Sequence, residues 1–155
     1  MPFRDKVCLA IATLFGVGYT PLCPGTAASV AALAVFLLVK SQSYFFIFTL
    51  VSVIVSFLVS TRAEKVFGEK DCKKIVIDDF SGMLITFLFI PRDVNFIIII
   101  AGFFLFRMLD MLKVPPSDRI EKANGALGIV GDDIVAGVYA SFILQAVRLL
   151  LKITS

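Results

Sequence analysis

Long apolar stretches separated by short polar clusters dominate the hydrophobic pattern of this chain. Five apolar segments are present, at residues 26–39, 41–61, 75–90, 94–112 and 134–151. The second of them is free of charge over 21 residues and matches the roughly 20 residues that a helix needs to cross a bilayer. Every segment is longer than a typical strand, and none has the alternating pattern of a membrane β-barrel. The pattern therefore predicts an all-α integral-membrane helical bundle, one domain over residues 1–155, with about four to five membrane-embedded helices.

The placement of the basic residues predicts an orientation for this bundle. With the N-terminus in the cytoplasm and all five segments crossing, eleven of the 15 lysines and arginines fall on the cytoplasmic side. This excess follows the positive-inside rule, and the same residues would attract anionic lipid headgroups. The formal net charge of +3 is too small to predict a nucleic-acid-binding protein.

Composition narrows the chemistry further. With 59% hydrophobic and 17% charged residues, the chain is more apolar than a soluble domain of this size. It has no histidine, which excludes Ser-His-Asp and Cys-His catalysis, histidine-ligated zinc and phosphohistidine intermediates. Cys8, Cys23 and Cys72 form no CxxC pair, so we expect reduced, structural cysteines.

Polar residues gather in four clusters, at residues 16–29, 78–82, 107–113 and 125–137. In the five-span topology all four fall on the cytoplasmic side, although that topology rests only on apolar lengths and on the Lys and Arg distribution. This convergence predicts a single active site at the cytoplasmic end of the bundle.

The aspartates of these clusters are candidate metal ligands. They are Asp78, Asp79, Asp110, Asp132 and Asp133. Carboxylates at a membrane boundary are costly unless they are paired or bound to a cation, and oxygen ligands without histidine or thiolate favour Mg²⁺ or Mn²⁺. The alternative is that the two Asp-Asp pairs cap helices that begin at residues 79 and 133.

Two further clusters offer phosphate-binding groups. Arg107 and Lys113 could hold a phosphate while Asp110 orients one of them, or the three could form an ordinary boundary salt bridge.

The loop over residues 16–29 places backbone N–H groups, Thr26 and Ser29 beside a helix start, a geometry that can bind phosphate. It lacks the lysine of a P-loop, so nucleotide binding is not predicted. Phe103, Phe104 and Phe106 are expected to face lipid or pack in the core.

Four sets of residues carry a family resemblance. They are Gly16, Gly18, Pro21, Pro24, Gly25, Thr26 and Ser29; Asp78, Asp79, Gly82 and Met83; Arg107, Asp110, Lys113 and Pro116; and Gly125, Gly128, Ile129, Asp132, Asp133, Ala136 and Gly137. In this order they resemble the phosphatidylglycerophosphatase A family over residues 14–137. The chain departs from the family pattern at Ala28 and Ala126 (Gly in the family), Val114 (Pro) and Asp79 (Glu). The last change withdraws a ligand oxygen by one methylene, which bears on the choice of metal.

The resemblance implies a multi-pass protein of the bacterial inner membrane that uses Mg²⁺ to hydrolyse the phosphomonoester of phosphatidylglycerophosphate, an anionic phospholipid, at the cytoplasmic face. The chain has no histidine and no D-x-D motif, and Ser29 stands where a cysteine-phosphatase loop has Arg, so direct attack by metal-activated water remains. On this hypothesis the metal ligands are Asp78, Asp79, Asp132 and Asp133. The catalytic residues are Asp79, Asp133, Asp110 and Arg107, and the phosphate-binding residues are Gly25, Thr26, Ser29, Arg107 and Lys113.

Other functions fit parts of the same pattern. The acids could bind a translocated cation in a small transporter, or belong to a structural membrane subunit. An intramembrane aspartyl protease is disfavoured because Ile129 interrupts its G-x-G-D motif. A phosphatase for a different lipid phosphate also fits. The sequence leaves open the oligomeric state, the number of metal ions and the identity of the general base.

Overall fold

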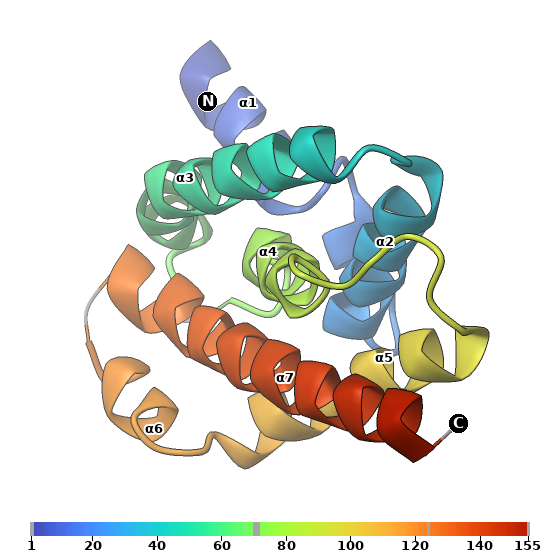
Figure 1. The fold of residues 1–155 in the computed structure, drawn as a ribbon. Helices are drawn as coiled ribbons and strands as arrows, with labels where there is room; N and C mark the ends of the chain where they lie inside the picture. Colours follow the sequence, from blue (N-terminus) through green and yellow to red (C-terminus); the bar gives the residue numbers. More distant parts are fainter. Residues whose placement is uncertain (1, 70–71, 124, 155) are drawn as a thin grey trace.

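Every regular element in residues 2–69, 72–123 and 125–154, the part of the chain that the computed structural model describes, is helical (Figure 1). The elements are α1 (Phe3–Ala12), the short 3-10 helix η1 (Val17–Tyr19), α2 (Pro24–Leu38), α3 (Gln42–Phe67), α4 (Ile77–Thr86), α5 (Phe96–Leu112), α6 (Ser117–Ile120) and α7 (Ala126–Thr154). For these residues the predicted all-helical fold is confirmed.

The centre of the bundle is α4, which Figure 1 shows enclosed by α2, α3 and α7. Both polar and apolar side chains of α4 are buried, among them Asp78, Ser81 and Met83. The Ser56 hydroxyl of α3 donates to the carbonyl oxygen of Ile77 at 3.0 Å and lies 3.1 Å from the Ser81 hydroxyl. With ten residues, α4 is about 15 Å long and cannot span a bilayer by itself.

Two helices, α3 and α7, are long and apolar enough to cross a membrane. The predicted span at 41–61 is thus part of a 26-residue helix, which is about 39 Å long. The other apolar helices are shorter, 15 residues in α2 and 17 in α5. Within the described residues two helices therefore have spanning length, and the four to five embedded helices stay a prediction.

Glycines allow α4 and α7 to cross closely. A Cβ atom added to Gly82 would lie 2.7 Å from the carbonyl oxygen of Asp133, and one added to Gly137 would overlap the carbonyl oxygen of Gly82. The two backbones therefore touch where they cross. This contact places the first turn of α4 beside the N-terminal part of α7.

Candidate active site

Residues from all four polar clusters line one cavity of about 790 Å³ at one end of the bundle. The start of α2 contributes Cys23, Pro24, Gly25 and Thr26; α4 contributes Asp78 and Asp79; α5 and its end contribute Arg107, Asp110 and Lys113; and α7 contributes Asp132 and Asp133. The expected convergence of the clusters is therefore present in the structure.

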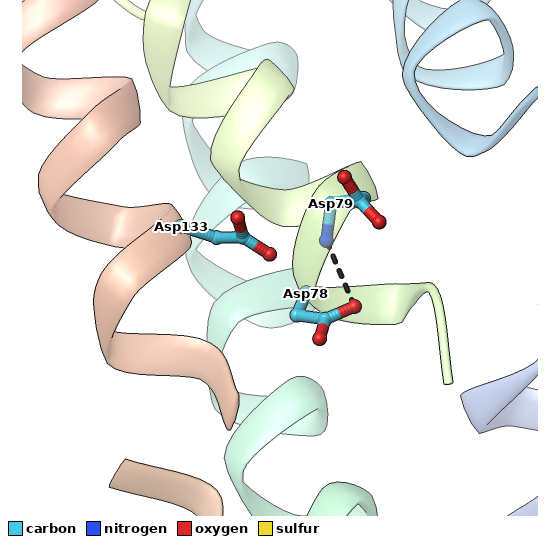
Figure 2. A group of neighbouring side chains, drawn as sticks. All are labelled: Asp78, Asp79 and Asp133. Carbon is cyan, nitrogen blue, oxygen red and sulfur yellow. Dashed lines mark hydrogen bonds between the residues drawn. The ribbon is translucent and has the colours of Figure 1, made fainter. Parts of the chain in front are cut away.

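Three carboxylates form the core of this cavity. Asp78, Asp79 and Asp133 can each place one oxygen within 4.8 Å of the other two. Figure 2 shows Asp133 reaching from α7 toward the two aspartates of α4. Asp78 and Asp133 are buried and Asp79 is half-buried, so the three charges repel one another with little water between them.

Local structure explains how the two acids of α4 are held. Both lie in the first turn of α4, where the helix dipole favours negative charge. The backbone N–H of Asp79 donates to Oδ1 of Asp78 at 2.9 Å (Figure 2). Helix α4 begins at Ile77 and not at residue 79, and its N-cap Val76 makes no side-chain capping hydrogen bond, so neither aspartate is the N-cap that the capping alternative required.

The capping alternative is wrong for Asp132 and Asp133. Helix α7 begins at Ala126, whose backbone N–H donates to the hydroxyl oxygen of Thr61 in α3 at 2.8 Å. The two aspartates consequently lie inside the helix, where their side chains cannot cap its N-terminus.

Arg107 forms a direct ion pair with the acid cluster. Its guanidinium forms ion pairs with Asp79 and, at 3.0 Å, with Asp110. The other oxygen of Asp79, Oδ2, lies against Gly25, where any Cβ would overlap the carboxylate. Asp79 is therefore fixed between α5 and the N-terminus of α2.

Lys113 and Asp132 form a second ion pair beside this cluster, 3.5 Å apart. Lys113 ends α5 in a left-handed conformation (φ +48°), which turns the chain so that its ammonium also reaches Glu121. Asp132 is thereby separate from the group of three carboxylates. Its Oδ1 is buried and accepts no hydrogen bond from the residues that the structure describes.

Not every predicted phosphate-binding residue reaches the cavity. Gly25 and Thr26 line it, whereas Ser29 is fully buried one turn further into α2 and does not. Residues that sequence reasoning missed also contribute to the wall: Cys23, Cys72, Lys73, Ile75, Phe103, Phe104, Met111 and Ile129. Phe103 precedes Arg107 by one helical turn, and this spacing was the available signal for its position.

The residues present fit a hard divalent cation. Three neighbouring carboxylates supply only oxygen ligands, which suit Mg²⁺ and Mn²⁺. Five aspartates line the cavity against three basic residues, Lys73, Arg107 and Lys113. A bound cation would relieve this excess of negative charge.

Clustered carboxylates that can bind a metal ion, beside an arginine and a lysine that can bind phosphate, lie in one cavity of a helical bundle. These groups are typical of a small helical phosphatase. The sequence profile of one such family, phosphatidylglycerophosphatase A, matches residues 10–148. The chain belongs to this family.

Individual relatives agree with that assignment. The chain is 34% identical to phosphatidylglycerophosphatase A of Escherichia coli over 86% of this chain and 79% of the relative. It is 33% identical to the Haemophilus influenzae protein of the same name, over 89% of this chain and 86% of the relative. A Bacteroides thetaiotaomicron protein named putative phosphatidylinositol-3-phosphatase is 34% identical over 88% of this chain and 90% of the relative. No solved structure matches the chain.

Proposed function

We propose that this protein hydrolyses the phosphomonoester of phosphatidylglycerophosphate to phosphatidylglycerol and inorganic phosphate. The observation that carries the proposal is the meeting of Asp78, Asp79, Asp133 and Arg107 in one cavity of a chain from this family. Family membership does not favour a transporter or a structural subunit.

Asp78, Asp79 and Asp133 would hold Mg²⁺, with Asp132 close by in the same cavity. When bound, Mg²⁺ would polarise a phosphoryl oxygen and make water a stronger nucleophile at neutral pH. The donor set of carboxylate oxygens supports Mg²⁺ over a metal that prefers nitrogen or sulfur ligands.

The remaining residues bind and orient the phosphate. Arg107 would neutralise charge that develops on the phosphoryl oxygens, and Asp110 would position the guanidinium through their ion pair. Lys113 and the backbone at Gly25 and Thr26 would complete the phosphate contacts. One water is consumed. Its oxygen forms a bond to phosphorus while the bond between phosphorus and the ester oxygen breaks, and a proton from this water passes to the departing alkoxide.

The proposed location is the bacterial inner membrane, with several crossings and the cavity open to the cytoplasm. Only 28% of the most apolar window of α3, and likewise of α7, is buried inside the protein. Exposed residues of α3 include Phe46, Ile47 and Leu58. Such large apolar side chains on the outside support a lipid environment for these two helices.

Phosphate release from the purified protein in detergent tests the reaction. We expect release from phosphatidylglycerophosphate in Mg²⁺ and loss of release when the metal is chelated. No release from this lipid under either condition would overturn the proposed reaction, and release that persists after chelation would overturn the metal requirement.

A second candidate substrate is phosphatidylinositol 3-phosphate, because the Bacteroides relative is as similar to the chain as the E. coli relative is. The two lipids are therefore assayed side by side. A higher kcat/KM for the inositol lipid would replace the first candidate with the second.

A further inference from the structure

The cavity has a charged side and an apolar side. The acids, Arg107 and Lys113 make up the first, whereas Phe103, Phe104, Met111 and Ile129 contribute to the second. A phosphomonoester headgroup needs only the charged side. The apolar wall therefore indicates that the substrate also has an apolar part.

The geometry of α5 shows where this apolar wall leads. Phe103, Arg107 and Asp110 are spaced i, i+4 and i+7, so they share the face of α5 that points into the cavity. Phe104 and Met111 directly follow Phe103 and Asp110 in the sequence, so they lie about 100° further around the helix than that face. Both line the cavity, yet their exposed fractions are 65% and 76%. They belong at once to the cavity wall and to the outer surface.

The facing wall is the N-terminal end of α2. Cys23 is exposed and lines the cavity, and Leu22 beside it is 90% exposed. Helices α2 and α5 make few contacts with each other, because α2 packs mainly on α4 and α5 packs mainly on α7. Because Cys23, Phe104 and Met111 line the cavity and are also exposed, the cavity reaches the outer surface between the start of α2 and the C-terminal half of α5.

We infer that this side opening admits the acyl chains of a phosphomonoester lipid. The headgroup lies at Arg107, and the chains leave the cavity across Phe104 and Met111 into the bilayer. The continuity of this apolar edge with the charged cavity argues for a diacyl lipid over a soluble phosphate ester, which would leave the edge uncovered. The inference rests on the proposed function and makes Phe104 and Met111 specificity-determining residues.

Added bulk at the opening tests the route. Met111→Trp and Phe104→Trp would narrow the passage for long acyl chains more than for short ones. We expect the ratio of kcat/KM for dioleoyl over dihexanoyl phosphatidylglycerophosphate to fall about tenfold. The matched control is Phe142→Trp, because Phe142 of α7 is 69% exposed but does not line the cavity. An equal loss on both substrates, or an unchanged ratio, would overturn the route.

A binding measurement separates this inference from the proposed reaction. Vesicles would carry either phosphatidic acid or phosphatidylcholine with a diazirine on one acyl chain, and crosslinks would be mapped by mass spectrometry. We expect phosphatidic acid to label Phe104 and Met111 at least fivefold more than phosphatidylcholine does, with equal labelling by the two lipids at the control position Phe142. Equal labelling of all three residues by both lipids would overturn the inference. Preferential labelling without phosphate release would retain the lipid route and refute the reaction.

Discussion

Asp79 has one carboxylate oxygen against Arg107 of α5 and the other against the backbone of Gly25 in α2. Asp133 completes the cluster from α7. The cluster can therefore be disturbed in two separate ways: by removing the charge of one aspartate, or by adding a methyl group that displaces an aspartate and leaves every charge in place.

Removing one charge without changing shape should stop the reaction. Asp79→Asn and Asp133→Asn each keep the side-chain volume but remove an anionic oxygen that a divalent cation needs. We expect phosphate release to fall at least about 100-fold, with unchanged helical circular dichroism. Asp93→Asn, an exposed acid in the α4–α5 loop, is the matched control. Near wild-type turnover in both cluster variants would refute their assigned roles.

Adding one methyl group at Gly25 should displace Asp79 without altering any charge. The new Cβ would overlap the carboxylate, while alanine is intrinsically the better residue for a helix. We expect Gly25→Ala to lower kcat about tenfold or more, as measured by phosphate release. Gly102→Ala adds the same methyl beside Phe87 and Leu144, away from the cavity, and is expected to retain activity. Equal activity of the two variants would contradict the role of this contact.

At this scale the sequence predicted which residue types meet but not how they pair. The acids, Arg107 and Lys113 are conspicuous because they interrupt apolar sequence. The pairing of Lys113 with Asp132 depends instead on the turn at the end of α5. The burial of Ser29 and the position of Phe104 depend on which face of a uniformly apolar helix points inward, and periodicity does not distinguish a lipid-facing residue from one at a cavity edge.

Among the helices, the crossing of α4 and α7 places Asp133 beside Asp78 and Asp79. Gly82 and Gly137 make this crossing possible because their backbones touch. The apolar pattern places this helix at residues 134–151, and the capping alternative begins it at residue 133, whereas α7 begins at Ala126. The earlier start involves Thr61, a residue of α3 that binds the first turn of α7; a contact so distant in the chain leaves no local signal.

The crossing predicts an unequal effect of two glycine substitutions on stability. In Gly137→Ala the added methyl meets a backbone carbonyl, whereas in Gly102→Ala it meets the movable side chains of Phe87 and Leu144. We expect Gly137→Ala to lower the free energy of unfolding by about 1–3 kcal/mol, the usual cost of overpacking, and Gly102→Ala to lower it less. Thermal unfolding in detergent provides the measurement. The reverse order would show that the crossing is not tightly packed.

For the whole molecule, the two ends of the bundle have different chemistry. One end holds the cavity. At the other, the Arg92 guanidinium lies 4.4 Å from the centre of the Phe36 ring and 4.0 Å from that of Phe45, and it donates to the carbonyl oxygen of Phe36 at 3.1 Å. Burial lowers the pKa of Arg92, but an arginine remains protonated. This cation binds the end of α2 to the start of α3.

The two ends are expected to lie on opposite sides of a membrane. Native Cys23 marks the cavity end and is exposed, and Asp93→Cys in a Cys23→Ser background would mark the Arg92 end. In intact spheroplasts we expect a membrane-impermeant maleimide to label the thiol at residue 93 but to label Cys23 only after permeabilisation. Labelling of both thiols from the same side would contradict a transmembrane arrangement.

The position of Asp133 in the last helix has a consequence for biosynthesis. Asp78 and Asp79 leave the ribosome well before α7 is made, so a nascent chain carries two of the three clustered carboxylates but not the third. The complete cluster forms only after α7 has been made and has packed against α4. A chain that stops before α7 therefore lacks the full set of acids, and the complete cluster indicates that α7 has been made and has packed.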